Sequence, residues 1–312
     1  MPVLVWGVPS ESPVRMIAEA LAAIGADVVA VPPHAENVEA DLGIDADGQL
    51  DGVLRVNGRT IEVAEIGGIY VRPVEPELVP QFRGLDPDPA ALRHAKAVHD
   101  ALIGFTEEAS RTGRRVANRL SAMASNMSKP FQAQTIGRHG FSIPDTLITD
   151  SPDEALEFAA RYDSVVYKSI SGIRSIVTTF DPIADRSRLD RLRWCPVQFQ
   201  ERIDGPDVRV HVVGDEVYAA IVQTTAVDYR YARAQVGVDA RLQPYRLPDV
   251  WARRCVSLAA ELALPFAGID LKLATDGRVV CFEANPSPGY PWYESEAGLP
   301  ISDAVARWLV AA

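Results

Sequence analysis

Residues 266–286, FAGIDLKLATDGRVVCFEANP, place two acidic side chains where a folded chain must bring them together. The Asp-Gly pair at 276–277 is a two-residue turn signal between apolar runs, which predicts a β-hairpin. If that turn is the whole loop, Asp270 lies directly opposite Glu283, and Asn285 points to the same face. Like charges at opposed positions destabilise a sheet, so some other group must compensate for them.

Three kinds of compensation are open from the hairpin alone. Two carboxylates and an amide oxygen are ligands that Mg²⁺ accepts, which makes Asp270, Glu283 and Asn285 candidate metal ligands. A raised pKa of one acid, or neutralisation by Lys272 on the same face, would also serve. The turn-rich stretch PSPGY that follows is suited to the rim of a cleft.

The composition narrows the class of protein. The 312 residues are 47% hydrophobic and 23% charged, which is typical of a globular chain of two or three modules. A net charge of −11 argues against a general binder of nucleic acids or membrane surfaces. The three cysteines are widely spaced, which predicts reduced, buried thiols. The chain opens directly into an apolar strand, without a basic targeting segment or a long apolar run, so we expect a cytoplasmic protein.

The pattern of elements predicts an α/β fold of three modules, at 1–118, 119–196 and 197–312. The first module opens with strand, helix and strand, which implies a parallel sheet. It lacks G-x-G-x-x-G, so we expect no dinucleotide site there. A second hairpin is predicted about Asn57-Gly58, and a helix over 89–111. The polar and aromatic stretch 225–247 has the character of a mobile segment.

Two lysines are candidates for binding an anion. Lys168 ends the apolar strand VVYK, and the following SISGIRS places Ser171, Gly172 and Arg174 where main-chain N–H groups could surround phosphates. Lys129 stands at the start of a helix, where a cation is unfavourable unless an anion offsets it. Taken singly, each lysine is better explained as an ordinary solvated side chain.

Further polar residues lie near the second module boundary. The strand QFQERI, which carries Glu201, could present main-chain groups to a purine, and Asp207 could accept a hydrogen bond from a ribose. Arg209 shares the face of Asp207 because side chains alternate along a strand. Arg230 lies in the polar stretch and could close over an anion. A surface hairpin is the alternative for this region. The sequence contains no G-x-S-x-G, H-E-x-x-H or P-loop motif, and its five histidines show no metal-binding spacing.

The order Lys129, Lys168, QERI, DVR, Asp270 and EANPSPG resembles the ATP-grasp superfamily, and within it the RimK-type branch. The resemblance covers about 118–289, and the three-module layout extends it to the whole chain. YVRP and the one-glycine loop after Lys168 are similar to ligases that macrocyclise ribosomal peptides, the graspetide or microviridin-type maturases. The loop SISGIRSIV departs from the glycine-rich loop of many members, which leaves its contacts open.

The resemblance implies an ATP site between the central and C-terminal modules, with a role for each candidate. The implied ATP-binding residues are Lys129, Lys168, Ser171, Gly172, Glu201, Ile203 and Asp207, with Glu201 and Ile203 contacting adenine through their main chain. The implied ligands of Mg²⁺, as two ions for which Mn²⁺ can substitute, are Asp270, Glu283 and Asn285. Arg209 and Arg230 would stabilise the transferred phosphoryl group, and Arg72 and Arg174 would contact substrate.

The implied activity is that of an ATP-dependent ligase, which joins a carboxylate to an amine or hydroxyl through an acyl phosphate. Its expected partner is an acidic precursor peptide or a small carboxylate, and the expected assembly is a homo-oligomer, a dimer or tetramer. The basic helix at 185–194 could dock an acidic leader peptide or could simply be solvated. A ligase that adds an amino acid, and a non-catalytic binder on the same scaffold, are the alternatives.

Overall fold

The first module is a parallel sheet covered on both faces. The computed structural model describes residues 1–48, 50–83, 89–170 and 176–311. The sheet has the order β2-β1-β6-β7, and all its neighbouring strands are parallel, as predicted. The elements are β1 (Val3–Gly7), α1 (Ser12–Ala23), β2 (Val28–Val31), β3 (Val38–Ile44), β4 (Leu50–Val56), β5 (Arg59–Glu62), η1 (Val63–Glu65), β6 (Gly68–Arg72), η2 (Pro76–Leu78), η3 (Pro80–Phe82), α2 (Pro89–Arg111) and β7 (Arg115–Ala117).

Strand β1 shows why this module needs two helical layers. Val3 and Val5 face the core that contains α1, while Leu4 and Trp6 face the core that contains α2. Strands β3, β4 and β5 form a separate antiparallel sheet. Its β4–β5 hairpin turns at Asn57-Gly58, both with positive φ, and this confirms the predicted turn.

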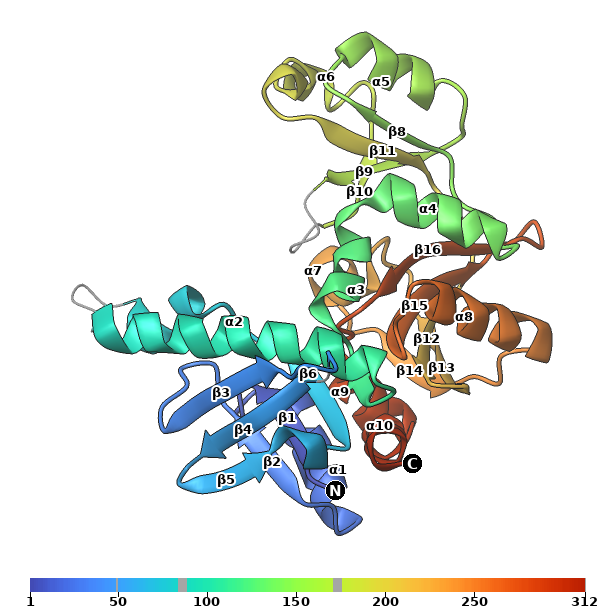
Figure 1. Ribbon diagram of the computed structural model, residues 1–312. Helices are drawn as coiled ribbons and strands as arrows, with labels where there is room; N and C mark the ends of the chain where they lie inside the picture. Colours follow the sequence, from blue (N-terminus) through green and yellow to red (C-terminus); the bar gives the residue numbers. More distant parts are fainter. Residues whose placement is uncertain (49, 84–88, 171–175, 312) are drawn as a thin grey trace.

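The central module is a four-stranded antiparallel sheet of order β10-β9-β11-β8 with helices on one side (Figure 1). Strand β11 was expected to open the C-terminal module, but it pairs with β8 and β9, so we propose that the central module continues to Glu201. The elements of this region are α3 (Leu120–Met123), η4 (Ala124–Met127), α4 (Lys129–Arg138), β8 (Thr146–Thr149), α5 (Pro152–Ala159), β9 (Val165–Ser169), β10 (Thr178–Phe180), α6 (Arg186–Leu189), η5 (Leu192–Trp194) and β11 (Val197–Glu201).

The C-terminal module is a five-stranded antiparallel sheet of order β14-β13-β12-β15-β16. Helices α8 and α4 share its apolar core on one face. The stretch 225–247, expected to be mobile, contains two short helices and an edge strand. The elements are β12 (Asp207–Val213), β13 (Glu216–Gln223), η6 (Tyr229–Tyr231), α7 (Ala232–Val236), β14 (Arg241–Pro244), α8 (Asp249–Glu261), β15 (Phe266–Leu273), β16 (Val279–Asn285), α9 (Pro291–Ala297) and α10 (Ile301–Val310).

The register of the β15–β16 hairpin differs from the prediction at its turn, but Asp270 still pairs with Glu283. The loop has three residues rather than two, because Ala274 N–H bonds to the carbonyl of Arg278 and Gly277 adopts φ +88°. This shifts the pairing by one residue. A β-bulge on the β16 side, after the Asp270 pair, shifts it back.

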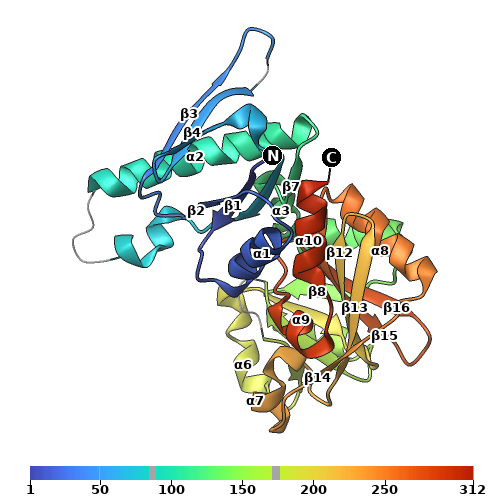
Figure 2. The same ribbon diagram turned by 90° about the horizontal axis from the view of Figure 1, so that it is seen from below.

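The first and C-terminal modules are packed into one body, in which α1 lies beside α10 (Figure 2). The central module stands apart from the first module (Figure 1). Helix α10 lies against α1 and the edge of the parallel sheet, and one apolar cluster contains residues of both modules. The Tyr290 hydroxyl donates to the carbonyl of Pro13 at 2.6 Å across this junction. The core of the central module is a separate cluster.

Candidate functional site

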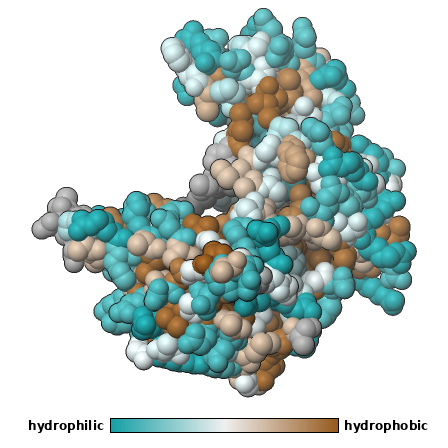
Figure 3. Space-filling view, in the orientation of Figure 1, coloured by the Kyte–Doolittle hydropathy of each residue, from teal (hydrophilic) through white to brown (hydrophobic). Residues whose placement is uncertain are grey.

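A cavity of about 630 Å³ lies between the sheet of the central module and the sheet of the C-terminal module. The surface of the molecule is hollowed where the central module overhangs the first (Figure 3). The predicted residues that line the cavity are Lys129, Lys168, Glu201, Ile203, Asp207, Arg230, Asp270 and Glu283. Lys129 and Glu283, which are 154 positions apart in the sequence, therefore line the same cavity.

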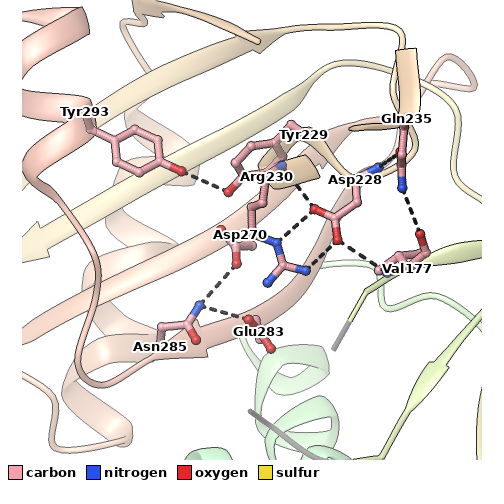
Figure 4. A network of polar contacts seen from close by, with 9 residues as sticks. All are labelled: Val177, Asp228, Tyr229, Arg230, Gln235, Asp270, Glu283, Asn285 and Tyr293. Atoms are coloured by element: carbon pink, nitrogen blue, oxygen red, sulfur yellow. Dashed lines mark hydrogen bonds and ion pairs between the residues drawn. The ribbon is translucent and has the colours of Figure 1, made fainter. Parts of the chain in front are cut away.

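The two acids of the β15–β16 hairpin converge with Asn285, as their register requires. Asn285 Nδ2 donates to Asp270 Oδ2 at 3.1 Å and to Glu283 Oε1 at 3.0 Å (Figure 4). The amide group thus stands between the two carboxylates. A half-turn of this amide would present its oxygen to the same place, because amide orientation is interchangeable in shape. Two carboxylates and an amide oxygen suit Mg²⁺.

Two cations compensate for the acid pair, and neither is the Lys272 considered from the sequence. Arg209 Nη1 donates to Asp270 Oδ1 at 2.6 Å, and Lys129 Nζ donates to Glu283 Oε2. Lys272 instead pairs with Asp207, at 3.2 Å between Nζ and Oδ1. Arg209 is buried, and its Nε has no hydrogen-bond partner among the described residues. Arg209 therefore stands behind Asp270, outside the lining of the cavity.

The acids differ in their electrostatic state. Burial raises the pKa of Asp270, and the nearby Glu283 raises it as well, against the opposing charge of Arg209. Burial also acts to raise the pKa of Glu283, but Lys129, Lys168 and the Asn285 amide outweigh it and lower this pKa to about 2. The pair therefore holds at least one full negative charge over the whole physiological range, and Lys129 and Arg209 balance it.

The central module contributes a lysine to the opposite wall of the cavity. Lys168 lies in β9, whose Tyr167 and Lys168 pair with Phe199 and Gln198 of β11. Burial lowers the pKa of Lys168; Glu283 opposes this, while Lys129 adds to it. A lysine held this way is ready to receive an anion, because an anionic ligand would restore its charged form.

The residues predicted to contact adenine and ribose also line the cavity. The Glu201 main-chain N–H is bonded to the carbonyl of Asp145 at 3.0 Å, and the Glu201 carboxylate accepts from Arg278 Nη1 at 3.2 Å. Arg278 comes from the β15–β16 turn, so it ties the strand of the central module to the acidic hairpin. Ile203 is buried and lines the cavity. Burial raises the pKa of Asp207, although Lys272 opposes this.

Arg230 lines the cavity from η6 and is gripped by a neighbour that the sequence analysis did not single out. Its Nε and Nη2 donate to the two oxygens of Asp228 at 2.9 and 2.7 Å. The Asp228 carboxylate is buried, whereas the Arg230 side chain is half exposed. The buried Asp228 carboxylate therefore fixes the orientation of the Arg230 guanidinium at the cavity wall.

Arg72 is placed outside the described lining of this cavity. It donates through Nε to Glu11 at 2.9 Å and through Nη1 to Ser287 Oγ at 2.5 Å, so it joins the first module to the turn after β16. The contact of Arg72 with substrate stays a prediction. Ser171, Gly172 and Arg174 lie outside the described residues.

Sequence analysis also missed two amides that hold the end of the acidic hairpin. Asn118 donates through Nδ2 to the carbonyls of Phe266 and Pro286, both at 2.5 Å, and accepts from Phe266 N–H at 3.0 Å. Gln132 exchanges two hydrogen bonds with the main chain of Ala284. Both are buried. No local motif marks them, because each acts on main chain that is distant in sequence.

The structure also bears on the predicted cysteines and on the candidate metal ligands. Cys255 and Cys281 are free and buried, as predicted, but Cys195 is exposed because it follows the short helix η5 at the module surface. Among the residues that the structure describes, no group of three or more His, Cys, Asp and Glu side chains could hold a metal ion. A metal at the acid pair would therefore depend on Asn285 as well.

A family model described as the RimK-like ATP-grasp domain matches residues 128–309. The chain belongs to the RimK-like ATP-grasp family. The match begins at the residue before Lys129 and includes both sheets that enclose the cavity. It confirms the fold and the branch that the sequence motifs resemble.

Curated relatives of this RimK-like chain include a ribosomal protein bS6–L-glutamate ligase of Escherichia coli O7:K1, which is 31% identical over 204 residues. That alignment covers 62% of this chain and 66% of the relative. A probable alpha-L-glutamate ligase of Enterobacter sp. is 30% identical over 189 residues, covering 56% and 61%. The alignments thus span just under two thirds of the relatives' length.

Solved structures of similar fold cover the whole chain. The macrocyclase MdnC of Microcystis aeruginosa MRC, bound with precursor peptide MdnA, has a TM-score of 0.79 and 21% identity over 100% of both chains. The ATP-grasp ligase PsnB, complexed with a phosphomimetic variant of minimal precursor, Mg and ADP, has a TM-score of 0.76 and 25% identity, over 99% of this chain and 97% of that one. The first likeness shows the fold of this RimK-like chain.

Within the residues that the structure describes, no helix is both long and apolar enough to cross a bilayer.

Proposed function

We propose that this protein is an ATP-dependent ligase that activates a carboxylate and joins it to an amine or hydroxyl within a ribosomal precursor peptide. The observation that carries the proposal is the meeting of Asp270, Glu283 and Asn285 with Lys129, Lys168 and Arg230 around one cavity between two sheets. Family membership supports the nucleotide chemistry. The precursor peptides named with MdnC and PsnB support a peptide substrate.

The reaction proceeds in two balanced steps. A carboxylate oxygen of the substrate attacks the γ-phosphorus of ATP, the bond to the β-phosphate oxygen breaks, and ADP leaves with an acyl phosphate formed. An amine or hydroxyl then attacks the acyl carbon, inorganic phosphate leaves, and the attacking group loses its proton. Phosphoryl transfer of this kind depends on positioning and charge neutralisation rather than on a nucleophilic side chain.

The residues of the chain would share this work. Lys129 and Lys168 bind phosphates from opposite walls, while Arg230 and Arg209 face the charge that develops on the transferred group. Glu201 and Ile203 border adenine, and Asp207 the ribose. Asp270, Glu283 and Asn285 would hold Mg²⁺, which would supply neutralisation of the phosphate charge.

A surface of the central module is suited to an acidic leader peptide. Leu189 and Leu192 are buried beneath α6 and η5, so the arginines of this segment face solvent beside the exposed Trp194. The exposed arginines are Arg186, Arg188, Arg191 and Arg193. We expect peptide affinity to fall as salt rises, and to fall further in the double variant Arg186→Glu/Arg191→Glu.

The deciding experiment uses an acidic peptide encoded beside the gene, with ATP and Mg²⁺. We expect substrate-dependent ADP release and the loss of one water from the peptide for each bond formed. The variant Asp270→Asn should keep its fold, judged by circular dichroism, and lose ADP release by at least about 100-fold, as removal of a transition-state charge contact does. Unchanged turnover in this variant would overturn the proposed metal site.

A second candidate function has its own support. The bS6–L-glutamate ligase relatives add weight to a ligase that attaches an amino acid to a protein or peptide. Mass spectrometry, which would detect the loss of water described above, would instead show the peptide mass increased by one amino-acid residue when the free amino acid is present. A protein that binds Mg-nucleotide without releasing ADP under either condition would belong to the non-catalytic class.

A further inference from the structure

The segment from Asp228 to Gln235 connects the two walls of the cavity. It lies between β13 and β14 of the C-terminal module and consists of η6 and the short helix α7. Asp228 is 4% exposed, which is unusual for a carboxylate and requires partners. Both of its oxygens accept from the Arg230 guanidinium, and Oδ1 also accepts from Arg230 N–H at 3.2 Å.

The same carboxylate reaches the central module (Figure 4). Val177 N–H donates to Asp228 Oδ2 at 3.4 Å, and the Val177 carbonyl accepts from Gln235 Nε2 at 3.3 Å. Gln235 Oε1 in turn accepts from Asp228 N–H at 3.0 Å. Both main-chain polar groups of Val177 are therefore held by this one segment. Both bonds are long, so they can be exchanged with water at small cost.

Val177 is linked directly to the wall that carries Lys168. It precedes β10, and Thr178 of β10 pairs with Tyr167 of β9, the residue before Lys168. On the other side, Tyr229 is pinned to the C-terminal module: its hydroxyl lies 2.9 Å from that of Tyr293, and its ring stacks on Trp292. The segment is thus anchored to the C-terminal module through Tyr229, while Asp228 and Gln235 at its two ends hold the β9–β10 hairpin through Val177.

We propose that Asp228 is a positioning residue which, with Gln235, latches the β9–β10 hairpin to the C-terminal module and sets Arg230 against the γ-phosphate. This inference rests on the proposed function, because it needs a nucleotide in the cavity. One carboxylate carries both contacts, so the side chain that orients Arg230 also holds Val177 beside the cavity.

The test compares nucleotides with and without a γ-phosphate, so it needs no peptide substrate. Calorimetric titration with Mg-ADP and with the non-hydrolysable analogue Mg-AMPPNP would be run on wild type, Asp228→Asn and Gln235→Ala. We expect Asp228→Asn to weaken AMPPNP binding about tenfold and ADP binding less than about twofold, because a hydrogen bond to a charged group is lost. Gln235→Ala should act in the same direction by about threefold, since it loses neutral contacts.

A matched control and a second readout separate positioning from folding. Arg233→Ala alters an exposed residue of the same helix that pairs only at 3.3 Å with exposed Asp239, and it should change neither affinity. Hydrogen exchange of the Val177 amide with AMPPNP bound should be faster in Asp228→Asn and Gln235→Ala than in wild type. In Arg230→Ala it should stay slow, because the contacts to Val177 remain.

Each outcome decides between the two proposals. If Asp228→Asn weakens ADP and AMPPNP equally, or if Val177 exchange is unchanged in Gln235→Ala, the latch is wrong while the proposed function stands. If wild type binds neither nucleotide, the proposed function fails and the latch fails with it. Loss of γ-phosphate preference together with faster Val177 exchange supports the latch.

Discussion

At the scale of single residues, the site depends on how each acid of the hairpin is compensated. Asp270 and Glu283 face one another, but their partners come from different places: Arg209 from the adjacent strand and Lys129 from helix α4. Burial dominates for Asp270, whose pKa rises, and the lysines dominate for Glu283, whose pKa falls to about 2. The opposed acids are therefore held by paired cations rather than left in repulsion.

This arrangement predicts how stability depends on pH. Because the folded pKa of Glu283 is lowered from 4.5 to about 2, its contribution is complete above the unfolded value and is lost as pH falls through that interval. Lys129→Met should therefore be less stable than wild type by about 2 kcal/mol at pH 7, a typical value for a hydrogen bond to a charged group. The difference should shrink steadily as pH falls from about 5 toward 2.

Urea unfolding without nucleotide at several pH values measures this difference. Lys96→Met provides the control, since Lys96 forms a half-exposed ion pair with Glu77 and its loss should have a much smaller effect at every pH. A Lys129→Met difference that stays constant down to the acid limit would show that Glu283 is not the partner that matters.

At the scale of elements, the close approach of β12 and β15 leaves no room at one position. A Cβ added to Gly268 would lie 2.1 Å from Arg209 Nη2 and 2.7 Å from Pro288 Cβ. The glycine thus makes space for the guanidinium that pairs with Asp270. Gly268→Ala should destabilise the fold by about 1–3 kcal/mol through overpacking and should displace Arg209, with loss of ADP release.

The measurements are thermal unfolding and the ADP-release assay. Gly104→Ala is the matched control, because a Cβ there meets nothing within 4 Å and the residue lies inside helix α2. It should be neutral or stabilising by up to about 1 kcal/mol. An active, stable Gly268→Ala protein would mean that Arg209 can shift without consequence.

The elements also show what the sequence could and could not reveal. Alternation and turn residues were sufficient for the parallel opening, for helix α2 and for the pairing of Asp270 with Glu283. The turn at 275–277 was misjudged because an Asp-Gly pair suits both two- and three-residue loops, and the bulge that restores the register has no sequence signal. The contact of Lys129 with Glu283 required the tertiary fold, since the two residues lie 154 positions apart. Asp228 caps η6 by accepting from Arg230 N–H, but its contact with Val177 has no sequence signal.

At the scale of the whole molecule, the separate cores predict which part moves. The first and C-terminal modules share an apolar cluster, whereas the central module has its own, so nucleotide should draw the central module toward a rigid base. Cys195 offers a label on the moving part, because it is exposed while Cys255 and Cys281 are buried. Thr60 in β5 and Glu296 in α9, both exposed, provide positions on the base.

Spin labels at Cys195 and at Thr60→Cys should come closer when Mg-AMPPNP is added, as measured by pulsed electron resonance. The pair Thr60→Cys and Glu296→Cys, in a Cys195→Ser background, should keep its distance because both labels stand on the body formed by the first and C-terminal modules. A change in the second pair would show that the base itself bends. An unchanged first pair with nucleotide bound would mean that the central module already stands in its nucleotide-bound position, with Val177 held by Asp228 and Gln235 as the structure shows.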